Sequence, residues 1–314
     1  MTLKQQDCDC QIDVIAPAWS VPLLKRMPEV NQAIELPIAH KQLKLLTRYR
    51  LGKSLRNREY DRAIVTPRSF KSALVPFFAR ARQRTGYRGE HRYGLLNDIR
   101  PLNKSILRQT VQRYVALAQE RDSKQAPAVP YPSLTVDKTN QARLVEKFNL
   151  DTSKKLVAMM PGAEYGPAKQ WPPSYYRELA LQLLKQDVQV IILGSAREQS
   201  LGEEIAADKQ IFNLCGRTEL VDVIDLLALV QCAVTNDSGL MHIAAATGVP
   251  VVAIYGSSDP QYTPPLTDNA RIMYKNLSCS PCFKRTCPLG HLNCLNTISI
   301  DEVNRTIAGM LWPK

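Results

Sequence analysis

Long hydrophobic runs are missing from this chain: no stretch comes close to the roughly 20 apolar residues that a membrane-spanning helix needs. The opening MTLKQQDCDCQ has no apolar core, so we expect it not to be a signal peptide. Internal repeats and low-complexity tracts are also missing, which excludes repeat architectures. We therefore expect a cytoplasmic protein whose eight cysteines are thiols or metal ligands, with contact to a membrane surface left open.

The composition, with 45% hydrophobic and 22% charged residues, is that of a globular protein, and 314 residues favour two domains. Residues 1–126 hold 24 Lys and Arg against 11 Asp and Glu, a net charge of +13, whereas the rest hold 17 against 18, a net charge of −1. We expect the basic half to face an anionic partner, such as nucleic acid, anionic lipid head groups or a phosphorylated sugar. Scattered surface charge is the simpler alternative, but the dense run RARQRTGYRGEHR at 80–92 favours a function.

The chain changes character near its middle. Strand-like runs at 12–16 and 63–66 and a helical pattern over 42–58 mark the N-terminal half. The segment APAVPYPSL, with three prolines in nine residues, has the composition of a linker. We therefore expect an N-terminal domain at 1–126, a linker at 127–135, a second domain at 136–298 and a final helix at 299–314.

Apolar strands alternate with helices throughout the C-terminal half, which predicts a doubly wound parallel sheet. The expected strands are 156–161, 188–194, 211–215, 232–237 and 249–256, and the expected helices begin at 173 or span 198–207, 219–230 and 238–247. Such sheets bind ligands beyond the carboxyl ends of their strands. That rule selects the glycine-bearing or small segments 162–169, 194–195, 215–216, 237–239 and 256–258.

The segment TNDSGLMHIAAATGVP is the sharpest of these, because a buried strand ends at Asp237 and a helix opens at Ser238. Free N–H groups and the helix dipole make such a start an anion site, above all for phosphate. Gly239 has no side chain, so a diphosphate can approach the backbone. Simple helix capping by Asp237 and Ser238 is the alternative. His242 lies one turn further along and faces the same place, or is a structural histidine.

Lys169 lies in a polar loop after a strand, where it can neutralise a diphosphate and assist a leaving group, or else is a surface lysine. We interpret the nearby Trp171 as a packing residue. Glu198 is a loose match to the acidic residues that bind ribose in dinucleotide folds.

Four cysteines, Cys279, Cys282, Cys287 and Cys294, lie within sixteen residues, and the first pair has metal-ligand spacing. The later spacings do not fit the usual paired pattern, so we expect free thiols and no metal, with a structural zinc site as the alternative.

Longer strings resemble a known family. PGAEYGPAKQWP, LCGRTEL, TNDSGLMHIAAATGVPVVAIYGSSDP and SPCFKRTCPLGH look like the lipopolysaccharide heptosyltransferases, as do DVIAPAW, RMPEV, SFKSALVP, RTGYRGE and RYGLLND in the N-terminal half. The resemblance implies a GT-B fold, in which two Rossmann-like domains face each other across a cleft and a C-terminal helix crosses back to the first. It also implies inverting transfer of L-glycero-D-manno-heptose from ADP-heptose to the first heptose of the lipopolysaccharide inner core, at the cytoplasmic face of the inner membrane.

We expect that the reaction requires no cofactor and that the protein binds no nucleic acid. The resemblance also assigns roles to individual residues. Catalysis falls to Lys169 and Asp237. Donor binding falls to Gly162, Lys169, Gly194, Ser195, Glu198, Gly216, Asp237, Ser238, Gly239 and His242. Acceptor binding falls to Lys71, Arg84, Arg88 and Arg92.

The chain departs from the family pattern at its start. Family members open with a strand and a Gly-Asp loop whose aspartate is the proposed general base, and about 30 residues of strand, loop and helix have no counterpart here. Asp13 belongs to a later strand and does not replace that base. We therefore expect residues 1–314 to bind the ADP-sugar and to transfer heptose poorly. Two further alternatives are a nucleotide-sugar epimerase and a basic nucleic-acid-binding protein, although no recognised reading helix or aromatic RNA motif supports the second.

Overall fold

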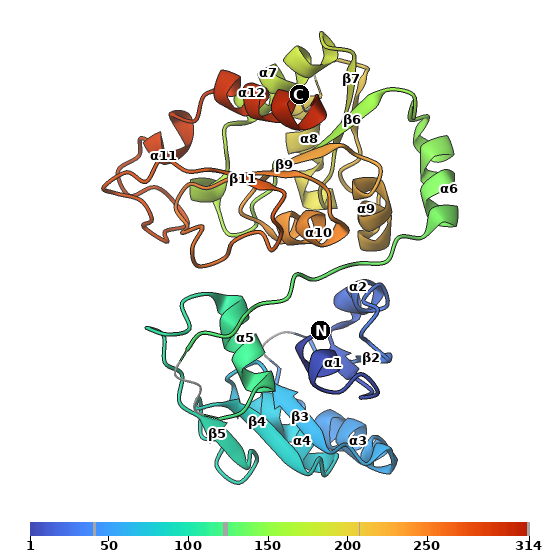
Figure 1. Cartoon of the computed structure of the whole chain (residues 1–314), viewed down its shortest axis with the longest axis vertical. Helices are drawn as coiled ribbons and strands as arrows, with labels where there is room; N and C mark the ends of the chain where they lie inside the picture. Colours follow the sequence, from blue (N-terminus) through green and yellow to red (C-terminus); the bar gives the residue numbers. More distant parts are fainter. Residues whose placement is uncertain (40–41, 122–124, 207, 313–314) are drawn as a thin grey trace. The chain divides into compact units, whose positions relative to one another are not determined.

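The computed structural model describes residues 1–39, 42–121, 125–206 and 208–312. The chain forms two compact units, which are coloured blue to green and green to red in Figure 1. The first comprises Met1–Lys25 and Glu29–Pro130, and the second comprises Arg26–Pro28 and Tyr131–Lys314. The change of unit after Pro130 falls inside the segment 127–135 that the sequence suggests as a linker. Within the described ranges, no helix is both long and apolar enough to cross a membrane.

Six parallel strands form the sheet of the second unit, in the order β11-β10-β9-β6-β7-β8. The strands are β6 (Lys155–Met160), β7 (Val188–Ile192), β8 (Ile211–Asn213), β9 (Cys232–Asn236), β10 (Val251–Ile254) and β11 (Ala270–Met273). The chain winds outward from β6 through β7 and β8, and then outward from β9 through β10 and β11, so the direction of winding reverses between β6 and β9. The predicted doubly wound parallel sheet is confirmed.

Two groups of helices pack with this sheet. The helices are α6 (Lys138–Phe148), α7 (Pro173–Leu184), α8 (Gln199–Ile205), α9 (Leu220–Leu227), α10 (Gly239–Thr247), α11 (Asn293–Asn296) and α12 (Ile300–Leu311). α7 contacts α8 and α12, whereas α9 contacts α6 and α10. The strands between them are almost continuously apolar and buried, as parallel strands covered on both faces must be. The end of α8 was expected at residue 207, which lies outside the described residues.

The segment 299–314 was expected to cross back to the N-terminal half, and this stays a prediction. Within the second unit, α12 places Val303, Ile307 and Leu311 in the hydrophobic core, where it packs against α7, β9 and β10. The physical reason is its strongly one-sided apolar face, which finds a buried partner inside its own unit. We therefore assign α12 to the second unit.

The first unit contains two small parallel sheets. One pairs β1 (Asp13–Ala16) with β2 (Gln32–Glu35), and the other has the order β3-β4-β5, from β3 (Arg62–Val65), β4 (Gln83–Tyr87) and β5 (Asp98–Arg100). The helices are α1 (Thr2–Gln6), α2 (Val21–Leu24), α3 (Leu45–Ser54), α4 (Leu74–Phe78) and α5 (Thr110–Ala118). The strands expected at 12–16 and 63–66 are β1 and β3, and the helix expected over 42–58 is α3 followed by a 3-10 turn, Arg56–Arg58.

Candidate functional site

The reversal between β6 and β9 brings two chain segments to one edge of the sheet. Parallel strands all end at the same edge, and ligands of doubly wound sheets bind beyond it at the reversal point. β6 continues into the loop 161–172, which contains a 3-10 turn, Pro167–Lys169. β9 continues through two residues into α10. Both segments were selected from the sequence, and the fold makes them neighbours.

Lys169 and Asp237 form an ion pair at this reversal point. The Lys169 Nζ donates to the Asp237 Oδ2 at 2.5 Å, and the two side chains are 18% and 5% exposed. The ring of Tyr165 lies beside the same ammonium, with its centroid 5.1 Å from Nζ. On the other side, the Thr263 hydroxyl donates to the Asp237 Oδ1 at 3.5 Å. An ammonium has three protons, so Lys169 keeps further donors for an anionic ligand.

Asn236 ties the two segments together and is a residue that the sequence analysis missed. Its side chain is fully buried. The Oδ1 accepts from the Trp171 N–H at 3.1 Å and from the Tyr176 hydroxyl at 3.2 Å. The Nδ2 donates to the Pro161 carbonyl at 2.7 Å. One amide thus holds both ends of the loop that carries Lys169, and its only signal in the sequence is its place just before Asp237.

The start of α10 is open. Ser238 is the N-cap residue, yet its side chain makes no capping hydrogen bond within the described part of the chain, and Asp237 is engaged with Lys169. Nothing lies within 4 Å of the position that a Cβ on Gly239 would take. The capping alternative therefore does not describe these side chains. Their arrangement leaves the first N–H groups of the helix directed at the space beside Lys169.

His242 lies one turn along α10 and has solvent access. Crowding by protein atoms nevertheless removes water from the ring and lowers its pKa, with Lys169 adding to the decrease and Asp237 opposing it. These charges act on the imidazole because all three side chains lie at the same end of the helix. The ring is therefore more readily neutral here than a histidine in water.

The other predicted donor residues cluster around Glu198. Its carboxylate accepts from the Ser195 N–H at 2.6 Å and from the Ser195 hydroxyl at 3.0 Å. Gly162 and Gly194 pack so closely against this carboxylate that a Cβ on either would lie under 3.0 Å from it. Gly216 has a φ of +72° and packs against Ala196. Glu198 is thus committed to a local capping box, and its contact with a ribose stays a prediction.

Three further residues near this edge are buried. Trp171 is fully buried and donates through Nε1 to the Ile298 carbonyl at 3.0 Å, so its interpretation as a packing residue is confirmed. Ser257 and Ser258, just beyond β10, are also buried. Their hydroxyls have no hydrogen-bond partner among the described residues. They lie in the segment 256–258 that the sequence analysis selected without assigning them a role.

Two of the predicted acceptor residues are structural. Arg92 is 2% exposed, and its guanidinium donates to the carbonyls of Pro67 and Tyr87. Arg84 donates through Nε to the Leu95 carbonyl at 2.7 Å and through a terminal nitrogen to the Ala81 carbonyl at 2.6 Å. These guanidinium groups hold loops together, because buried carbonyl oxygens need donors. Arg92 has no surface left for an acceptor, whereas the half-buried Arg84 stays a prediction for acceptor binding.

The other two acceptor candidates remain accessible. Arg88 is exposed directly after β4, and Lys71 is half-buried in the 3-10 turn Phe70–Ala73 that follows β3. Arg68 joins them, since its Nε donates to the Arg88 carbonyl at 3.2 Å. Arg68 was not among the acceptor residues predicted from the sequence, although it lies in a loop after a strand. These three cations gather at the carboxyl edge of the β3-β4-β5 sheet.

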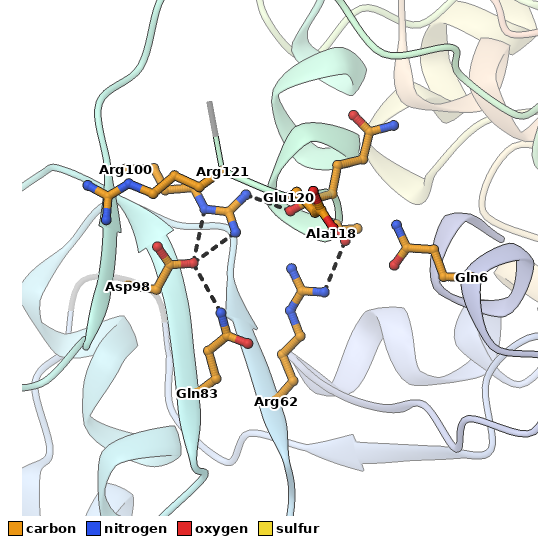
Figure 2. A pocket seen from close by; sticks show the side chains of 9 residues that line it. Gln6, Arg62, Gln83, Asp98, Arg100, Ala118, Glu120 and Arg121 are labelled. Carbon is orange, nitrogen blue, oxygen red and sulfur yellow. Dashed lines mark hydrogen bonds and ion pairs between the residues drawn. The ribbon is translucent and has the colours of Figure 1, made fainter. Parts of the chain in front are cut away.

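A hollow of about 740 Å³ lies at the opposite, amino edge of that sheet. Figure 2 shows the side chains that line it. Arg62 and Arg100 line it from β3 and β5. Arg62 donates to the Ala118 carbonyl at 3.0 Å, and Arg100 donates to the Asp98 carboxylate at 2.8 Å and to the Gln119 carbonyl at 2.9 Å. These bonds hold the end of α5. Both arginines are therefore engaged in bonds within the protein.

The four clustered cysteines lie in one region of the second unit. Burial raises the pKa of Cys294, and the charges of the other three cysteines raise it further. Backbone N–H groups, that of Leu292 foremost, lower the pKa of Cys287. However, Asp7, Cys8 and Asp9 are the only three ligand groups in the described ranges whose atoms lie within 4.8 Å of one another. The zinc alternative stays a prediction.

Comparison with known proteins agrees with this geometry. The sequence profile of glycosyltransferase family 9 (heptosyltransferase) matches residues 48–293. Lipopolysaccharide heptosyltransferase 2 of Salmonella typhimurium is 48% identical over 87% of this chain and 81% of its own length. The structure of E. coli ADP-heptose lps heptosyltransferase II has a TM-score of 0.85 and 42% identity, covering 99% of this chain and 92% of that one.

A more distant structure, E. coli heptosyltransferase WaaC with ADP, has a TM-score of 0.67 at 18% identity and covers 98% of this chain and 94% of that one. That likeness shows the fold alone. With its two Rossmann-like units, the protein has the GT-B fold, and it is a glycosyltransferase. The chain belongs to glycosyltransferase family 9, the heptosyltransferase family.

Proposed function

We propose that this protein transfers L-glycero-D-manno-heptose from ADP-heptose to the first heptose of the lipopolysaccharide inner core, with inversion at the sugar carbon. The relatives named heptosyltransferase 2 support this choice of donor and acceptor. The acceptor is anchored in a membrane by its lipid, so we place the reaction at the cytoplasmic face of the inner membrane.

The observation that carries the proposal is the Lys169–Asp237 ion pair beside the open start of α10. Transfer of the sugar leaves a negative ADP, and its stabilisation requires positive groups already in position. The N–H groups at the start of α10 bind the diphosphate, and Lys169 donates to its oxygens. Asp237 is the positioning partner that fixes the ammonium. A distant relative of the same fold has a structure with ADP, which supports a nucleotide as the ligand of this chain.

We propose that this donor chemistry needs no metal or other cofactor. The Lys169 ammonium and the amino end of α10 supply the positive charge that a divalent cation would otherwise bring to a diphosphate. The direct check is activity after exhaustive treatment with EDTA. Loss of transfer that magnesium restores would contradict this part of the proposal.

The acceptor side rests on accessible cations of the first unit. Lys71, Arg88 and Arg68 can pair with the phosphate and carboxylate groups of the inner core, because none of them is as deeply buried as Arg92. Their joint replacement by alanine is expected to raise the acceptor KM and to leave the donor KM unchanged. The matched control replaces the exposed Lys104 and Arg108 of the same unit.

The test of the function incubates the purified chain with ADP-heptose and heptosyl-Kdo2-lipid A and follows the acceptor by mass spectrometry. We expect the mass of one added heptose, with the anomeric centre inverted in the NMR spectrum. Lys169→Met is expected to lower kcat by about 10²-fold or more. The control, Lys185→Met, changes an exposed lysine at the end of α7.

Incubation with the donor alone separates this function from an epimerase. Conversion of ADP-heptose to an epimer without acceptor would favour the epimerase. Binding of ADP-heptose without any transfer would contradict the proposed function for this chain. It would leave an ADP-sugar-binding protein.

A further inference from the structure

Three leucines at the start of α3 lie on the surface of the first unit. Leu43, Leu45 and Leu46 are 49%, 51% and 58% exposed. Isolated exposed leucines are common on proteins, but three within four residues form an exposed apolar cluster. A cluster of this kind is a candidate surface for contact with an apolar partner.

A buried arginine holds this leucine-bearing turn in place. Arg48 is 5% exposed, and its Nε donates to the Leu43 carbonyl at 2.7 Å. A terminal nitrogen of the same guanidinium donates to the Gln42 carbonyl at 3.3 Å. The turn is thus tied to the helix that follows it, and the leucine side chains are presented by a fixed backbone.

Tyr49 and Gly52, which follow Leu45 along α3 at spacings of four and seven, are committed to packing inside the unit. Gly52 approaches α4 so closely that a Cβ would lie 2.5 Å from that of Phe78. The ring of Tyr49 meets the ring of Phe78 at 5.2 Å between centroids. α3 therefore cannot turn its leucines inward without giving up these contacts.

The segment 42–58, which contains α3, is cationic and carries no acid. It contains six Lys and Arg and no Asp or Glu. Arg50 and Lys53 are exposed, and they follow Leu46 at spacings of four and seven, which places all three along one stripe of the helix. In the described chain, no ion pair involves a residue of this segment.

We propose that Leu43, Leu45 and Leu46, with the cations of α3, dock this protein onto an anionic phospholipid bilayer. The leucines enter the boundary between head groups and acyl chains, and the lysines and arginines lie at the level of the phosphates. Nucleic acid would use the cations but leave the leucines in water. The inference deepens the proposed function, because it names the surface by which the enzyme reaches a lipid-anchored acceptor.

The test measures binding of the purified full chain to vesicles by sedimentation. Vesicles of phosphatidylcholine with about one-third phosphatidylglycerol are compared with phosphatidylcholine alone, since acidic lipids attract each nearby cation. We expect binding to the anionic vesicles that weakens as salt is raised. The variant Leu43→Ser, Leu45→Ser, Leu46→Ser is expected to bind about tenfold or more weakly, because each buried apolar side chain adds to the affinity.

Two controls keep the result specific. Ile272→Ser with Leu289→Ser removes exposed apolar side chains of the second unit, 44% and 62% exposed, and is expected to bind like the wild type. Arg50→Gln with Lys53→Gln is expected to reduce binding to anionic vesicles only. Thermal melting of each variant confirms that it folds.

Unchanged binding of the leucine variant, equal binding to neutral vesicles, or no vesicle binding by the wild type would each overturn the proposal. Transfer to a detergent-dispersed acceptor is measured in parallel. Transfer without vesicle binding would remove the docking surface and keep the proposed function. Vesicle binding without transfer would keep the docking surface and contradict the proposed function.

Discussion

Replacing Gly239 by valine tests whether the start of α10 is the nucleotide site. No atom lies within 4 Å of the Cβ position, so the protein itself has room for the larger side chain. Glycine and valine differ in helix propensity by only about 0.5 kcal/mol, so the free energy of unfolding is expected to change by no more than that. The substitution therefore tests ligand binding without disturbing the fold, because the valine occupies space that a ligand needs and the protein does not.

The expected effect on binding follows from the groups that the valine covers. A hydrogen bond from a backbone N–H to a charged phosphate oxygen is worth about 1.5–3 kcal/mol. The valine methyl groups lie where a phosphate oxygen must come to reach the first N–H groups of α10. Loss of one such bond gives a decrease in ADP affinity of at least about tenfold, or 1.4 kcal/mol.

Isothermal titration calorimetry with ADP measures this loss, and urea denaturation measures the stability. The matched control is Gly309→Val in α12, where nothing lies within 4 Å of the Cβ position either. It makes the same chemical change on a helix surface remote in sequence from the loop of Lys169, and its ADP affinity is expected to equal that of the wild type. An unchanged affinity in Gly239→Val would refute the assignment of the diphosphate to this helix start.

Two more predictions concern groups beside that site. Asn236→Ala removes three buried hydrogen bonds and is expected to lower the free energy of unfolding by about 2–4 kcal/mol in urea, with weaker ADP binding; an unchanged urea midpoint would contradict the role of this amide in holding the loop. The pKa of His242 is lowered in the folded protein, so the unfolded chain binds the proton more tightly and stability falls as the pH drops below about 6.5. His242→Gln is expected to lose less stability than the wild type between pH 7 and pH 5, and parallel pH profiles of the two proteins would refute this.

Much of the second unit is determined by local sequence. The alternation of apolar strands and helices predicts the parallel sheet, because strands buried on both faces must be apolar along their whole length. The rule for parallel sheets then selects the loop of Lys169 and the segment of Asp237 as site candidates before any contact is known. The glycine at the start of α10 is likewise visible in the sequence, since only a missing side chain leaves that backbone open.

The tertiary structure decided which charged groups are available. Arg84, Arg88 and Arg92 are alike in the sequence, yet Arg92 is buried on backbone carbonyls, Arg84 is half-buried and bonded to two carbonyls, and Arg88 is exposed. A guanidinium binds whichever acceptor is nearest, and carbonyls distant in sequence cannot be located from composition. The amphipathic pattern of α12 predicted a helix but not the unit that would bury its apolar face.

The pairing of Lys169 with Asp237 also belongs to the tertiary structure. The two residues are 68 positions apart, and they meet only because β6 and β9 lie side by side where the winding reverses. Asn236 gains its role in the same way, from carbonyl and N–H groups that the fold brings to it. Local patterns depend on neighbours along the chain and can be read from the sequence, whereas a site depends on neighbours in space, which only the packing of the strands supplies.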